Sequence, residues 1–230
     1  LAKRGKKVHL TTTDPAAHLK FVLDETRGVS MSHIDEAEEL KKYQSEVLAK
    51  ARASGMSDED IAYVEEDLRS PCTQEIAVFR AFAEIVEKAD DQVVVIDTAP
   101  TGHTLLLLES TQSYNHEIQR TKGEIPQSVT RLLPRLKSDE TEVIIVTLPE
   151  ATPVYEALRL EVDLKRAGIA AKWWVVNQSL YGTNTTNPML AAKAASEIEW
   201  LNRIDEHAGG KFALIAWSPD EIKGDRLLTL

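Results

Sequence analysis

The sequence predicts an α/β protein: a doubly wound, mostly parallel sheet with helices on both faces and a helical insertion. Three observations predict this fold class. Short apolar runs alternate with amphipathic stretches, nearly every residue of each run is apolar, and polar residues gather where the runs end. Strands that are apolar throughout suit a parallel sheet whose two faces are both covered. In such sheets, ligands bind beyond the carboxyl ends of the strands.

Strands and helices are expected to alternate along the whole chain. The expected strands are residues 8–12, 93–96, 143–146, 173–176 and 212–215. The expected helices are residues 36–52, 58–68, 73–88, 153–167 and 188–207. The first three helices form a charged insertion at about 31–88, and glycines close the last two. No repeat or linker interrupts the pattern, so residues 1–230 are expected to form a single domain.

The composition excludes several classes of function. The chain has 230 residues and a formal net charge of −10. This charge argues against a nucleic-acid or anionic-membrane surface, because both need a basic footprint. Cys72 is the only cysteine, which excludes an internal disulfide and fits a reducing compartment. The apolar runs are too short to span a bilayer, and the first residues lack the apolar core of a signal peptide.

Two acids follow expected strands and are candidates for nucleotide chemistry. Four apolar residues precede Asp97, and an acid at a strand end can hold the water shell of Mg²⁺. Asp14 follows the first strand, where it can orient an attacking water or the hydration shell of the metal. Each acid also has a simpler interpretation. A strand-end aspartate is often a helix cap, and Asp14 precedes Pro15, a good first residue of a helix.

The phosphate-binding pattern Gly-x-x-x-x-Gly-Lys-Ser/Thr is not found in the sequence. The Gly-Lys pairs, at residues 5–6 and 210–211, are not followed by Ser or Thr. Residues 1–5 are typical of the end of a helix that Gly5 closes. We therefore expect a longer protein in which the first strand and the P-loop directly precede residue 1. We also expect these residues alone not to turn over ATP, because phosphate contacts carry most of the catalysis.

Several segments resemble the arsenical pump-driving (arsenite-transporting) ATPase family. The first is residues 10–19, with the sequence Leu-Thr-Thr-Thr-Asp-Pro-Ala-Ala-His-Leu. The second is more specific and is residues 97–105, with the sequence Asp-Thr-Ala-Pro-Thr-Gly-His-Thr-Leu. Asp-Leu-Arg-Ser-Pro-Cys-Thr at 67–73 resembles the metalloid-binding segment in the C-terminal half of the two-halved bacterial enzyme. Segments at 146–150 and 175–178 extend the resemblance over essentially the whole chain. It implies a P-loop NTPase-like fold.

The resemblance implies nucleotide contacts at matching positions. Asp14 and Asp97 match the switch I and switch II acids beside Mg²⁺ and the attacking water. Asn177 matches an adenine-contacting position. Residues 218–224 resemble the loop over the adenine, although Trp217 departs from the family pattern. The contacts implied in that loop come from Pro219, Glu221 and Ile222.

The resemblance also implies that Ser70, Cys72 and His103 ligate As(III) or Sb(III) between two halves. Both metalloids are thiophilic, so a thiolate is the expected ligand. Because one cysteine cannot close a site, further ligands must come from another half or chain. His103 lies in the switch II loop, so a bound metalloid would reach the nucleotide switch. Three alternatives stay open: Cys72 as a buried apolar residue, Ser70 as a helix cap and His103 as a structural histidine.

The implied function is hydrolysis of MgATP that energises arsenite or antimonite efflux, with the metalloid as an allosteric activator. The implied partners are a second nucleotide-binding half or subunit, an integral membrane arsenite carrier and a metallochaperone, and no nucleic acid. The implied location is the cytoplasm, at the inner face of the membrane through the carrier. An alternative is a tail-anchored membrane-protein targeting ATPase, whose zinc clasp needs two cysteines where this chain has Cys72 alone. A partitioning ATPase is a third class and lacks the metalloid segment.

Overall fold

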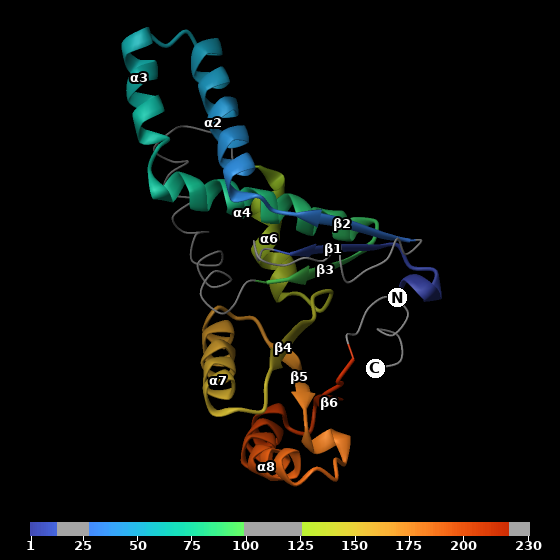
Figure 1. Cartoon of the computed structure of the whole chain (residues 1–230). Helices are drawn as coiled ribbons and strands as arrows, with labels where there is room; N and C mark the ends of the chain where they lie inside the picture. Colours follow the sequence, from blue (N-terminus) through green and yellow to red (C-terminus); the bar gives the residue numbers. More distant parts are fainter. Residues whose placement is uncertain (13–27, 99–125, 221–230) are drawn as a thin grey trace. The chain divides into compact units, whose positions relative to one another are not determined.

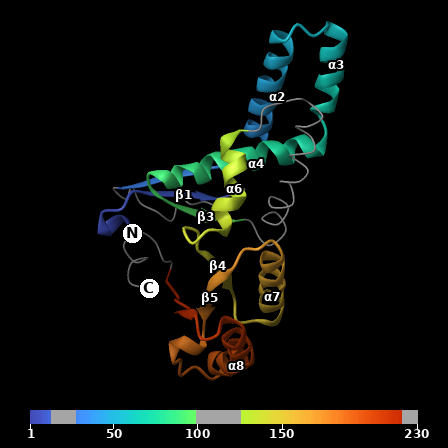
Figure 2. The same cartoon turned by 180° about the vertical axis from the view of Figure 1, so that it is seen from behind.

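The α/β class with parallel strands is confirmed. A computed structural model describes residues 1–12, 28–98 and 126–220. The chain divides into two compact units, residues 1–17 with 25–134 and residues 18–24 with 135–230. Each unit contains one three-stranded parallel sheet, with strand orders β2-β1-β3 and β4-β5-β6. Figure 1 labels the helices and strands of both units, and Figure 2 shows the same chain from behind.

The sheet of the first unit consists of β1 (Val8–Thr12), β2 (Val29–His33) and β3 (Val93–Asp97). β1 is central: its last residue, Thr12, lies opposite His33 of β2 and Asp97 of β3. Ala2–Arg4 form a short 3-10 helix, η1, which ends at Gly5. β2 was not predicted from the sequence, because polar residues alternate with apolar ones there and no continuous apolar run is formed.

The helices between β2 and β3 are α2 (Glu36–Ala53), α3 (Asp58–Asp67) and α4 (Pro71–Glu87), followed by the 3-10 turn η2 (Lys88–Asp90). They match the three predicted helices. Each begins at a side-chain cap, because the side chains of Asp35, Ser57 and Ser70 accept backbone N–H groups. Helix α4 packs against α2. In both views it runs along the sheet of its unit (Figures 1 and 2).

A further helix, α6 (Gln127–Lys137), was not expected from the sequence. Its basic residues and the internal Pro134 conceal a short apolar stripe, of which Val129 and Leu132 are buried. No helix in the described parts of the chain combines the length and apolar character needed to cross a membrane.

The second unit contains β4 (Val143–Thr147), β5 (Ala171–Ser179) and β6 (Phe212–Ala216). Its helices are α7 (Ala151–Arg166) and α8 (Pro188–Ala208), with the 3-10 turn η3 (Tyr181–Thr183) after β5. All the predicted elements of this region are confirmed. Helix α7 packs on β4 and β5, and α8 packs on β5 and β6. Four side chains from these elements form a core that is at most 1% exposed: Val154, Trp174, Val176 and Ile204.

Candidate functional site

The carboxyl ends of β1 and β3 lie side by side in the first unit. Thr12 is 1% exposed and pairs with Asp97, which is exposed at the end of β3. Parallel neighbouring strands end at the same edge, so Asp97 lies where α/β proteins bind their ligands. Its carboxyl oxygens are of the kind that Mg²⁺ prefers. Asp14, two residues after Thr12 in the sequence, lies outside the described residues.

A buried polar cluster around His9, near the start of β1, ties β1 to β2 and η2. The imidazole of His9 is 4% exposed, and its Nδ1 lies 2.8 Å from the Oγ of Ser30. The Oγ of Ser30 also donates to the carbonyl of Val8 at 3.4 Å, and the Oγ of Ser32 donates to the Oγ1 of Thr11 at 3.0 Å. Its Nε2 lies 2.8 Å from the Oγ of Ser32 and 3.3 Å from the Nζ of Lys88. Burial and then the charge of Lys88 lower the pKa of His9.

The cysteine segment forms the start of α4. The Oγ of Ser70 accepts the N–H of Thr73 at 3.4 Å and lies 3.0 Å from the Oγ1 of Thr73. Ser70 is therefore the N-cap, which was one of the two interpretations open for it. Cys72 is exposed, which excludes the buried apolar alternative. Within residues 1–12, 28–98 and 126–220, no three His, Cys, Asp or Glu side chains form a group that could hold a metal ion. His103 lies outside those residues.

The second unit presents Asn177 near the carboxyl end of β5. The next residue, Gln178, has a φ of 57°, which a residue with a side chain rarely adopts. The pairing of β5 with β6 shifts register between Val176 and Ser179. The Oδ1 of Asn177 accepts the N–H of Gln178 at 3.0 Å. Strained backbone of this kind clusters at ligand-binding positions.

The end of β6 lies beside the end of β5. The N–H of Trp217 donates to the carbonyl of Ser179 at 2.9 Å, and the N–H of Asp220 donates to the Oγ of Ser218 at 3.2 Å. Pro219 is exposed in this segment. The structure therefore places Asn177 and Pro219 at neighbouring strand ends of one unit. Glu221 and Ile222 fall outside the described residues.

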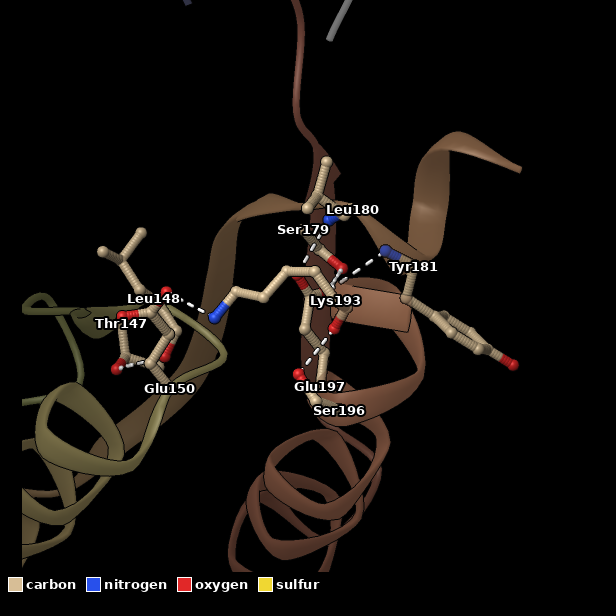
Figure 3. A network of polar contacts seen from close by, with 9 residues as sticks. All are labelled: Thr147, Leu148, Glu150, Ser179, Leu180, Tyr181, Lys193, Ser196 and Glu197. Carbon is tan, nitrogen blue, oxygen red and sulfur yellow. Dashed lines mark hydrogen bonds and ion pairs between the residues drawn. The ribbon is translucent and has the colours of Figure 1, made fainter. Parts of the chain in front are cut away.

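Glu197, a buried acid that holds the end of β5 and the turn after it, was not predicted from the sequence (Figure 3). Glu197 is only 2% exposed to solvent. Its Oε2 accepts from the Oγ of Ser179 at 2.8 Å and from the N–H of Tyr181 at 3.1 Å, and its Oε1 accepts from the N–H of Leu180 at 3.1 Å. The sequence does contain a signal, because this acid lies on the buried stripe of α8: Ala194, Glu197, Leu201 and Ile204.

The fold and these strand-end positions define a P-loop NTPase-like α/β protein. The profile of the anion-transporting ATPase family matches residues 1–138 and again residues 127–229. The chain therefore belongs to the anion-transporting ATPase family, as the resemblance implied.

Curated relatives agree with this assignment. An arsenical pump-driving ATPase of Escherichia coli is 41% identical over 232 residues, covering 100% of this chain and 40% of the relative. A protein of the same name from Acidiphilium multivorum is 41% identical over 216 residues, covering 94% of this chain and 37% of the relative. ATPase GET3 of Paracoccidioides lutzii is 26% identical over 253 residues, covering 90% of this chain and 74% of that protein. This chain spans about 40% of the length of these two arsenical pump-driving ATPases.

Proposed function

We propose that this chain is one nucleotide-binding half of an ATPase that hydrolyses MgATP to energise arsenite or antimonite efflux. The observation that carries the proposal is the 41% identity to an arsenical pump-driving ATPase. The match extends over the whole of this chain and over 40% of the relative. A second half or subunit supplies the rest of the site. The further partners are a membrane arsenite carrier and a metallochaperone. In this proposal the ATPase lies in the cytoplasm and is bound to the membrane through the carrier.

Asp97 and Asp14 carry the phosphate chemistry in this proposal. The support is the register of the first sheet, in which the strand that leads to Asp14 ends opposite Asp97. Asp97 holds the water shell of Mg²⁺ through its carboxyl oxygens. Asp14 orients the water that attacks the terminal phosphate. Mg²⁺ itself offsets the charge that develops on the phosphate oxygens.

The nucleotide base lies at the second unit in this proposal, against Asn177 and the segment that contains Pro219, Glu221 and Ile222. The support is the pairing of β5 with β6, which brings Asn177 and Pro219 to one edge of the sheet. An amide side chain and exposed backbone are suited to the edge of a base, because they offer hydrogen bonds without a net charge.

The metalloid site in this proposal combines Cys72, Ser70 and His103 with ligands from the second half. The support is the exposure of Cys72, since a thiol must be accessible to bind a thiophilic metalloid. Ser70 still has an oxygen lone pair after it accepts from Thr73, so capping and ligation are compatible. Metalloid binding then draws the two halves together and favours hydrolysis.

The test compares antimonite stimulation of ATP hydrolysis in variants of the intact protein. Cys72→Ser is expected to abolish the stimulation. Ser70→Ala and Ser57→Ala form a matched pair, because each removes the N-cap of a neighbouring helix and only Ser70 is proposed as a ligand. We expect a reduced response from Ser70→Ala and a normal one from Ser57→Ala. Full stimulation of the Cys72→Ser variant would refute the metalloid site.

The membrane-protein targeting alternative has support from the match to ATPase GET3, at 26% identity. It predicts that the intact protein binds an apolar helical peptide and that antimonite has no effect on its ATPase rate. The same assay therefore separates the two functions.

A further inference from the structure

Helix α8 supports the ends of two neighbouring strands through side chains one helical turn apart (Figure 3). The Nζ of Lys193 lies 2.9 Å from the Oε1 of Glu150, which follows β4. Glu197, four residues later, reaches the segment after β5. Residues four apart share a face of a helix, so both contacts come from the same side of α8.

The two contacts differ in strength because they differ in burial. The side chains of Lys193 and Glu150 are 48% and 49% exposed, and water screens such a pair. Glu197 is 2% exposed and receives three hydrogen bonds, so breaking its contacts leaves the fully buried hydroxyl of Ser179 without its partner. Glu197 is therefore the contact that fixes the segment.

That segment directly follows the strained turn of the candidate base site. Residues 179–181 carry the three donors to Glu197, and Gln178 with its positive φ comes immediately before them. The N–H of Gln178 in turn occupies the Oδ1 of Asn177. This contact sets the orientation of the Asn177 amide, whose NH₂ group can donate to a ligand.

We propose that Glu197 is a positioning residue for the nucleotide base. It holds residues 179–181, so that Gln178 keeps its left-handed conformation and Asn177 presents a donor at the end of β5. Glu197 itself does not touch the nucleotide. This inference rests on the proposed ATPase function and adds a residue that sets affinity for the base.

Glutamine cannot replace this acid. Both carboxyl oxygens accept from a backbone N–H, Oε1 from Leu180 and Oε2 from Tyr181. A glutamine amide has one oxygen and one NH₂ group, and either orientation places the NH₂ group against one of these N–H groups. Glu197→Gln therefore keeps the size of the side chain while it disturbs the segment.

The test measures KM and kcat for ATP hydrolysis by the intact protein. We expect Glu197→Gln to raise KM about tenfold and to leave kcat within about twofold, because the change acts on base binding and not on the phosphate. Glu199→Gln is the matched control: it makes the same substitution at an exposed position of the same helix, and it leaves both constants unchanged. Hydrogen exchange at the amides of Leu180 and Tyr181 is expected to accelerate in Glu197→Gln alone.

The outcomes separate this inference from the proposed function. Faster exchange at residues 180 and 181 with an unchanged KM would overturn the positioning role and leave the ATPase assignment intact. A fall in kcat at unchanged KM would show a general loss of folded enzyme, which also overturns it. If the intact wild-type protein neither binds nor hydrolyses ATP, the proposed function fails and the inference fails with it.

Discussion

Replacing Glu197 with alanine is expected to destabilise the second unit. The substitution removes both carboxyl oxygens of Glu197. The Oγ of Ser179 and the backbone N–H groups of Leu180 and Tyr181 then lose their acceptors. Ser179 is fully buried, so water does not readily replace its lost partner.

The size of the effect follows from these three bonds. Each contributes about 1 kcal/mol net, so together they contribute about 3 kcal/mol to the free energy of unfolding. Native proteins have stabilities of only about 5–15 kcal/mol, so this loss is a large fraction. For a unit of roughly 100 residues with an m-value near 1 kcal/mol/M, the urea midpoint falls by about 3 M.

Tryptophan fluorescence during urea unfolding measures this unit selectively, because all four tryptophans belong to it: Trp173, Trp174, Trp200 and Trp217. Glu199→Ala on the exposed side of α8 is the control and is expected to change stability by less than about 0.5 kcal/mol. A loss below about 1 kcal/mol in Glu197→Ala would refute the reasoning, since it would mean that the three donors find other partners.

Three further predictions concern side chains that the structure describes. Burial and then Lys88 lower the pKa of His9 below its usual 6.5, so the unfolded chain binds this proton more readily. Stability of the first unit should therefore fall as pH drops through and below 6.5, and His9→Gln should flatten that slope in urea unfolding followed by circular dichroism. Ser70→Ala should cost about 1 kcal/mol through loss of the α4 cap, seen as faster amide exchange in the first turn of that helix. Lys193→Met should cost less than about 1 kcal/mol in fluorescence-detected unfolding, because its pair with Glu150 is half-exposed.

The elements that were predictable have a local signal. The apolar runs predicted β3, β4 and β6, and the helical spacing of apolar residues predicted α7 and α8. β2 was missed because it forms no continuous apolar run, although its alternation of apolar and polar residues is itself typical of a partly buried strand. α6 was missed because Pro134 and several basic residues interrupt its apolar stripe.

The site was predictable only in part, for a related reason. The acids and amides at strand ends stand out in the sequence, because polar residues follow apolar runs. The role of Glu197 depends on contacts with residues that precede it by 16 to 18 positions, which local spacing does not reveal. The positive φ of Gln178 was equally hidden, because glycine is the residue normally expected in that conformation.

The central claim is that the strand-end acid at the edge of the first sheet acts on a magnesium nucleotide. The most direct test is steady-state MgATP hydrolysis by the intact protein with Asp97→Asn, beside Asp91→Asn just before the same strand as the control. We predict that Asp97→Asn lowers kcat at least about 100-fold, because it removes a group that organises the metal and the phosphate. The control should stay within about twofold of wild type. Equal rates in both variants would contradict the account.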